Sequence, residues 1–134
     1  MKNKVFLGGT CANTTWRNEL IRDLHVSYFD PVVENWTSQC IEIEDTEKGS
    51  FCNIHLYVIT SAMQGVYSIA EVVESVMTPD KVTILHVGPA GFTEGQLRSL
   101  RAVVDLVKRH GGIAYVDDDL KRTANVINNA FRED

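Results

Sequence analysis

The stretch NIHLYVITSAMQGVYSIAEVVESVMTPDKVTILHV, residues 53–87, decides the fold, because it holds two apolar runs separated by a helical segment. The runs at residues 53–60 and 81–87 are short and rich in β-branched residues, which is typical of strands buried on both faces of a sheet. Residues 68–77 between them predict a helix. A strand, a helix and a strand in this order form a crossover unit with two parallel strands.

The same alternation continues on both sides of this unit. Further strands are predicted at residues 5–7, 26–29 and 113–116. Further helices are predicted at residues 15–25, 94–110 and 120–131, with Thr14 or Thr15 capping the first and Thr93 capping the second. Residues 38–48 fit either a short amphipathic helix or a solvated excursion.

Five strands separated by helices predict an α/β fold in which helices cover both faces of a parallel sheet. We therefore expect a flavodoxin-like or Rossmann-like three-layer sandwich with a five-stranded parallel sheet. The chain of 134 residues is expected to form a single domain over residues 1–134.

The composition is that of an ordinary globular protein, with 44% hydrophobic and 23% charged residues. A net charge of −5 gives no electrostatic reason to expect a nucleic-acid polymer or an anionic membrane as partner. No stretch approaches the roughly 20 apolar residues that span a bilayer. The three cysteines, Cys11, Cys40 and Cys52, are odd in number and lack metal-ligand spacing, so we expect reduced thiols in a cytoplasmic protein.

The carboxyl ends of parallel strands meet at one edge of a sheet, where open α/β folds bind ligands. The Gly8-Gly9-Thr10 turn follows the first predicted strand, Asp30 follows the second, and Glu71 enters the helix after the third. A glycine turn with free amides suits a phosphate or a sugar hydroxyl. Asp30 and Glu71 are thus expected to meet beside this turn, where a carboxylate is a candidate nucleophile or base.

Glu71 has a second interpretation. Ser68 and Glu71 fit the S-x-x-E capping box, in which the glutamate side chain bonds back to the start of its own helix. A glutamate held in that way is a poorer nucleophile. The pattern alone leaves both roles open.

Aromatic and basic side chains near the strand ends are further candidates. Trp16 either packs in the core or lines a pocket for a flat heterocycle, and Trp36 either contacts a ligand or subunit or covers a sheet edge. Arg17 is expected to meet an anionic group, to pair with Asp30, or to form an ordinary surface salt bridge.

No metal or cofactor site is expected. His55 and His86 fall inside predicted strands and are expected to be hydrogen-bonded sheet residues. The acidic run Asp117-Asp118-Asp119 either binds a cation or places carboxylates at a helix N-terminus. The sequence contains neither G-x-G-x-x-G nor a P-loop, so no dinucleotide or P-loop site is predicted.

Several segments together resemble the nucleoside 2-deoxyribosyltransferase superfamily, most closely its short deoxyribosyltransferase-like branch. The segments are VFLGGTCANTTWRNELI (5–21), FDPVVENWT (29–37), VITSAMQGVYSIAEVVES (58–75) and GFTEGQLRSLRAVVDLVKRHGG (91–112). The resemblance covers nearly the whole chain. It implies an oligomer, a dimer or higher, that acts on the N-glycosidic bond of a nucleoside or nucleotide.

The resemblance also implies roles for residues. Glu71 matches the family's nucleophile, which attacks C1′ of the sugar, and Asp30 is the candidate acid for the leaving base, as in retaining glycosidases. The expected substrate-binding residues are Gly8, Gly9, Thr10, Trp16, Arg17, Trp36, Gln64, Tyr67 and Ser68. Tyr67 either orients Glu71 or obstructs the sugar.

One departure from the family pattern leaves a second function open. The family carries an acidic residue just after the third strand, where this chain has Thr60 and Ser61. The first hypothesis, from the resemblance, is an N-glycosidic transferase or hydrolase that uses Glu71. The second is a non-catalytic nucleotide-binding or sensor module, and a third is a purely structural subunit.

Overall fold

The computed structural model describes residues 3–11, 14–33 and 37–130, and these residues contain a five-stranded parallel sheet. Its strands are β1 (Lys4–Gly9), β2 (Ser27–Phe29), β3 (Ile54–Ile59), β4 (Val82–Val87) and β5 (Ile113–Val116). They lie in the order β2-β1-β3-β4-β5, with every neighbouring pair parallel. This is the flavodoxin-like order, so the predicted fold class is confirmed.

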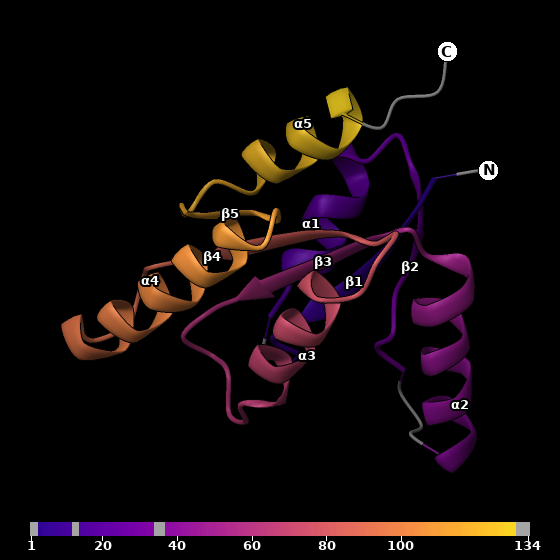
Figure 1. Cartoon of the computed structure of the whole chain (residues 1–134), viewed down its shortest axis with the longest axis horizontal. Helices are drawn as coiled ribbons and strands as arrows, with labels where there is room; N and C mark the ends of the chain where they lie inside the picture. The colour runs from indigo at the N-terminus through magenta and orange to yellow at the C-terminus, as the bar shows by residue number, and fades with distance from the viewer. Residues whose placement is uncertain (1–2, 12–13, 34–36, 131–134) are drawn as a thin grey trace.

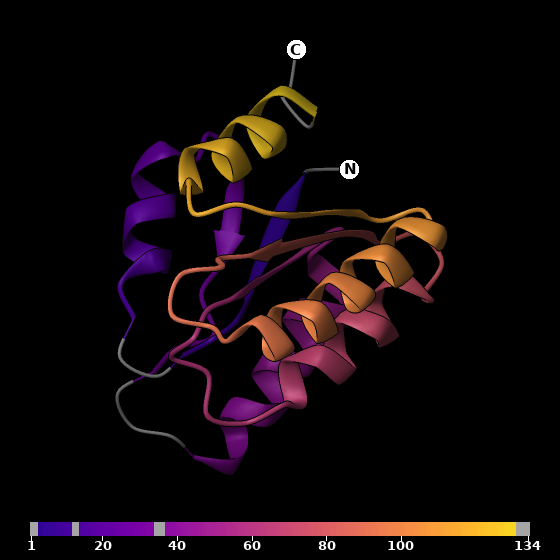
Figure 2. The same ribbon diagram turned by 90° about the vertical axis from the view of Figure 1, so that its left-hand side faces the viewer.

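The helices complete the three layers. They are α1 (Trp16–Asp23), α2 (Ser38–Thr46), the π-helical turn η1 (Glu47–Phe51), α3 (Tyr67–Val76), α4 (Glu94–Arg109) and α5 (Leu120–Ala130). Helices α1 and α5 cover one face of the sheet and α3 and α4 the other (Figures 1 and 2). The undecided residues 38–48 are helical, and α2 stands at the β2 side of the sheet (Figure 1).

Alternation along the strands builds two separate cores. In β3, Leu56 and Val58 pack with Trp16 and Leu20 of α1, whereas Tyr57 packs on the other face with the helices α3 and α4. Successive side chains of a strand point to opposite faces, so each apolar strand residue belongs to one core. All six residues of β3 are buried, as expected for a strand between two helical layers.

The ends of the helices agree with the predictions only in part. Thr93 caps α4 as predicted, because its Oγ1 accepts the Gln96 amide at 3.1 Å. Helix α1 begins after Thr15, but no side chain caps it, and it ends at Asp23 instead of residue 25. Within the described ranges, no helix is both long and apolar enough to cross a membrane.

Gly8 and Gly9 correct the prediction of a glycine turn, because both belong to β1 and pair with Tyr57 and Val58 of β3. A Cβ on Gly9 would lie 2.1 Å from the Val58 carbonyl oxygen, and its φ of +111° is in the region that favours glycine. The two glycines therefore let the end of β1 lie close against β3. Their bare backbone stands at the point where the strand order reverses, between β1 and β3.

Candidate active site

A cavity of about 330 Å³ opens at the carboxyl end of β1. Its polar wall is formed by Cys11, Arg17, Glu44, Ser68 and Glu71. Its apolar wall is formed by Phe6, Pro31, Val32, Val33 and Tyr67, and Gly8 and Gly9 complete it. The wall therefore combines β1, the segment after β2, and residues of α1, α2 and the N-terminal half of α3.

A second cavity of about 230 Å³ adjoins the first. The two share Gly9, Cys11, Tyr67 and Ser68, so they are neighbouring parts of one recess. Thr10 and Gln64, both expected to bind substrate, line only the second part. A recess with an apolar wall and a few polar groups is the usual form of a small-molecule site.

Glu71 does not cap its own helix. Helix α3 begins at Tyr67, its N-cap is Val66, and no side chain caps it. The capping-box interpretation of Ser68 and Glu71 is therefore wrong, because the N-cap is Val66, two residues before Ser68, which the motif requires at that position. The Glu71 side chain, 10% exposed, instead accepts a hydrogen bond from Lys48 Nζ at 3.0 Å.

Lys48 comes from the π-helical turn η1, which polar contacts fix in place. His55 on β3 bonds through Nε2 to the Lys48 carbonyl at 2.7 Å, and Lys81 Nζ donates to the carbonyls of Gly49 and Cys52. Burial disfavours the charge of Lys48, but the hydrogen bond and the charge of Glu71 outweigh it and raise the pKa of Lys48. An ammonium group therefore stands beside the candidate nucleophile.

Glu44 is a site residue that the sequence analysis missed. It lies on α2, four residues before Lys48, and lines the same cavity as Glu71. Burial raises its pKa, and the negative charge of Glu71 raises it further. If residues 38–48 had been assigned to a helix, the spacing of four residues would have placed Glu44 and Lys48 on one face.

Asp30 lies beside the cavity and is already engaged. Its Oδ1 accepts the Val32 amide at 3.0 Å and lies 3.7 Å from Arg17 Nε. Its neighbours Pro31, Val32 and Val33 line the first cavity. The role of Asp30 as the acid stays a prediction.

Arg17 and Trp16 on α1 donate hydrogen bonds to backbone carbonyls at the end of β1. The buried Arg17 guanidinium donates to the carbonyls of Leu7 at 3.0 Å and Thr10 at 2.8 Å. Trp16 Nε1 also donates to the Thr10 carbonyl, at 2.8 Å, and Trp16 packs in the core on the α1 face. Arg17 thus lines the cavity with most of its hydrogen bonds directed to backbone, while Trp16 lines neither of the two cavities.

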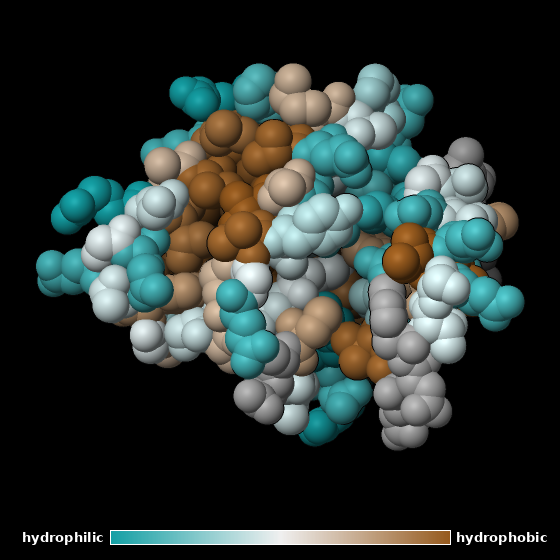
Figure 3. Space-filling view, turned by 90° about the horizontal axis from the view of Figure 1, so that it is seen from below, coloured by the Kyte–Doolittle hydropathy of each residue, from teal (hydrophilic) through white to brown (hydrophobic). Residues whose placement is uncertain are grey.

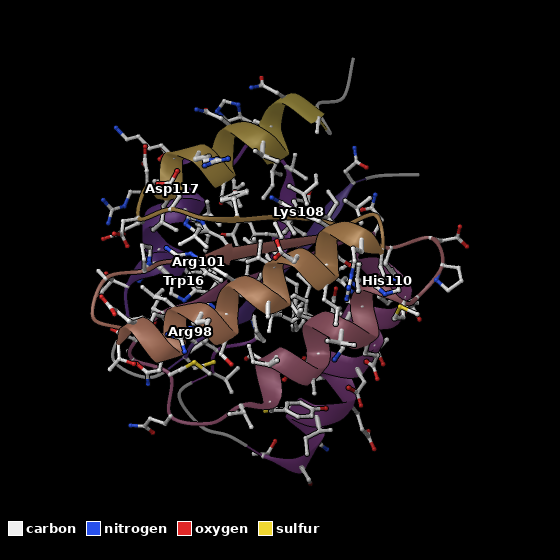
Figure 4. All side chains as sticks on the ribbon, turned by 60° about the vertical axis from the view of Figure 1, so that its left-hand side comes forward. Trp16, Arg98, Arg101, Lys108, His110 and Asp117 are labelled. Carbon is white, nitrogen blue, oxygen red and sulfur yellow. The ribbon has the colours of Figure 1, made fainter. Side chains whose placement is uncertain are left out.

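The two strand histidines are hydrogen-bonded sheet residues, as predicted. His55 Nδ1 lies 2.8 Å from Ser75 Oγ, and His86 Nδ1 lies 2.6 Å from Thr123 Oγ1. The acidic run comes directly before α5, and Asp117, labelled in Figure 4, accepts the Asp119 amide through Oδ1 at 2.8 Å. Among the described residues, no group of three or more acidic, histidine or cysteine side chains is placed to hold a metal ion.

The structure thus places most of the predicted site residues around one recess. Gly8, Gly9, Arg17, Tyr67, Ser68 and Glu71 line the first cavity, and Thr10 and Gln64 line the second. Trp36 lies outside the described residues. The binding roles of all these residues stay predictions.

One comparison with known proteins gives a match. A family model described as nucleoside 2-deoxyribosyltransferase like matches residues 2–89. The matched range runs through the end of β4 and includes Glu44, Lys48 and Glu71. The chain matches no curated protein and no solved structure.

Proposed function

The chain belongs to the nucleoside 2-deoxyribosyltransferase-like family, and on this premise we propose that it cleaves or exchanges the N-glycosidic bond of a nucleoside or nucleotide. The observation that carries the proposal is the position of Glu71. Its side chain lines a recess at the reversal point of the sheet and does not cap its own helix. Ligands bind at such points in open α/β sheets.

In the proposed reaction a Glu71 oxygen attacks C1′ of the sugar and forms an ester bond to it. The bond between C1′ and the base nitrogen breaks, and its electron pair leaves with the base. A second base or a water molecule then attacks C1′, and the ester electrons return to Glu71. This is the two-step chemistry of a retaining glycosidase, and the acceptor decides between transfer and hydrolysis.

The substrate that we propose from this chemistry is a nucleoside or nucleotide. From the resemblance to the family we also propose a homo-oligomer. Gly8 and Gly9 offer bare backbone to the sugar, and Val32 and Val33 offer an apolar wall to the base. We also propose a cytoplasmic location, because an odd number of widely spaced cysteines is typical of proteins that keep their thiols reduced.

The test replaces Glu71 by glutamine and screens nucleosides and 5′-nucleotides for base release by chromatography. Glu71→Gln keeps an oxygen that can accept the Lys48 hydrogen bond, so the fold should persist while base release is lost. Intact-mass spectrometry of the wild type during turnover should show a glycosyl adduct that the variant lacks. Glu74→Gln, exposed on the same helix α3, is the matched control and should release base at the wild-type rate. Full activity in Glu71→Gln would refute the assignment.

A non-catalytic nucleotide-binding module is the second candidate function, and two observations favour it. Lys48 already pairs with the Glu71 carboxylate, and Thr60 and Ser61 follow β3 where the family carries an acid. This candidate predicts saturable binding of a nucleotide, measured by calorimetry, with no base released over long incubation. It also predicts that Glu71→Gln changes the affinity for the nucleotide, and that neither the wild type nor the variant releases base.

A further inference from the structure

We propose that Glu44 on α2 is the acid that donates a proton to the departing base. This inference rests on the proposed function and concerns a residue that the sequence analysis did not single out. It starts from the wall of the first cavity. Among the described residues in that wall, Glu44 and Glu71 are the two that carry carboxyl groups.

The two carboxyl groups come from different elements and converge on one space. Glu44 approaches from α2 at the β2 side, and Glu71 approaches from the first turns of α3. A retaining mechanism needs two carboxyl groups on the same glycosidic bond, one to attack the sugar and one to assist the leaving group. The cavity therefore contains the required pair without Asp30.

The charged groups around Glu44 and Glu71 indicate which of the two is the acid and which is the nucleophile. Lys48 donates its hydrogen bond to Glu71 at 3.0 Å, so the candidate nucleophile already has a cationic partner. The charged groups that act on Glu44 are Glu71 from α3, Lys48 from η1, Asp45 from its own helix and Arg17 from α1. Burial and the Glu71 charge dominate, and they raise the pKa of Glu44. A carboxyl group whose pKa is raised by burial and by a neighbouring negative charge is suited to hold a proton for a leaving group.

The proton balance of the two steps is simple. As Glu71 attacks C1′, the Glu44 carboxylic acid gives its proton to the base, which leaves as a neutral molecule, and Glu44 becomes a carboxylate. In the second step that carboxylate takes a proton from the attacking water or acceptor base. Glu44 is thereby returned to its starting form, and Glu71 is released as a carboxylate.

The experiment uses leaving groups that differ in their need for a proton. Wild type, Glu44→Gln and Asp30→Asn are each assayed on a nucleoside that the wild type cleaves and on the 4-nitrophenyl glycoside of the same sugar. Nitrophenolate leaves without protonation, so a missing acid should not slow it. Glu42→Gln, an exposed change two residues away on the same helix, is the matched control.

We expect Glu44→Gln to lower kcat for the nucleoside by about 10²–10⁴-fold, the usual contribution of a general acid, and to leave the nitrophenyl glycoside within about tenfold of wild type. The alkaline limb of the wild-type pH profile should disappear in the variant, because that limb reports loss of the acid's proton. Glu42→Gln should behave as wild type on both substrates.

Other outcomes separate the two proposals. If Glu71→Gln is inactive but Glu44→Gln cleaves the nucleoside normally, the proposed function stands and Glu44 is not the acid. If Asp30→Asn alone slows cleavage of the nucleoside but not of the nitrophenyl glycoside, the proposed function also stands and Glu44 is again not the acid. An equal loss on both substrates in Glu44→Gln would indicate a structural effect and would also refute the assignment. If the wild type cleaves no nucleoside or nucleotide, the proposed function and this inference fail together.

Discussion

At the scale of single residues, Gly8 and Gly9 line the first cavity for a reason that the sequence did not indicate. The sequence predicted a turn suited to a phosphate or a sugar hydroxyl, and in the structure both glycines belong to β1. A Cβ on Gly8 would lie 2.7 Å from the Tyr57 ring, and one on Gly9 would lie 2.1 Å from a β3 carbonyl. Their lack of side chains therefore sets the spacing of β1 and β3 under the cavity.

A substitution at Gly9 tests this interpretation. Gly9→Ala should lower the free energy of unfolding by about 2–6 kcal/mol, since it adds strain at φ +111° and a clash with the β3 backbone. Gly49→Ala is the control, because nothing lies within 4 Å of its Cβ position, and it should be neutral or stabilising by up to about 1 kcal/mol. Urea denaturation of both variants gives the comparison, and equal effects would contradict the role of Gly9.

Glu71 and Glu44 show what a sequence can and cannot reveal about a site. Glu71 was found because an apolar strand precedes it and a family motif surrounds it. Glu44 was missed because its segment gave no clear period, and the structure explains why: α2 buries none of its residues, so it has no apolar stripe. Lys48 was missed because its position depends on a π-helical turn, which contacts with His55 and Lys81 hold in place.

At the scale of secondary-structure elements, the two central strands were predicted to within one residue at each end. Residues 53–60 and 81–87 contain β3 and β4 because buried parallel strands are nearly continuous apolar runs. The helix starts were less certain, as α3 shows. Helix α3 starts at Tyr67, two residues before the start that Ser68 as the N-cap would give, and the pattern alone does not fix so small a difference.

His55 and His86 connect their strands to neighbouring elements through hydrogen bonds of neutral rings. A carbonyl accepts from His55 Nε2 and another from His86 Nε2, so each ring carries its proton on Nε2. Each Nδ1 therefore accepts from a hydroxyl, Ser75 in one case and Thr123 in the other. A second proton on either ring would force that hydroxyl to turn and accept in place of donating, and burial already lowers the pKa of both histidines.

This arrangement predicts acid sensitivity. Because the folded pKa of each histidine is lowered, the unfolded chain binds protons first as the pH falls. The stability that the neutral rings provide is complete above the unfolded pKa of about 6.5 and is lost progressively below it. Urea midpoints should therefore fall between about pH 7 and pH 5.

Two variants make that measurement specific. His55→Gln loses the hydrogen bonds of the ring, so it should be less stable than wild type at neutral pH. It also has no titrating ring at this position, so it should lose less stability on acidification. His110→Gln changes an exposed histidine and should keep the full wild-type loss. A wild-type midpoint that does not change across this pH range would contradict the prediction.

At the scale of the whole molecule, apolar side chains remain exposed around α3. Val66 is 75% exposed, Tyr67 73% and Met77 59%, and Figure 3 shows apolar surface gathered over the α3 and α4 side. Large exposed apolar patches usually mark contact sites. Since Tyr67 also lines the cavity, a subunit packed on this surface would lie next to the proposed site.

We therefore predict a homo-oligomer, a dimer or higher, whose contact includes this surface. Light scattering of the wild type should give at least twice the chain mass, and Val66→Asp should shift it towards the monomer. Val66 is the N-cap of α3, where aspartate is a favoured residue, so the change should not unfold the helix. Asn125→Asp on α5, exposed on the opposite layer, is the control and should keep the wild-type mass. A monomeric wild type would remove the prediction, and an oligomer unaffected by Val66→Asp would place the contact elsewhere.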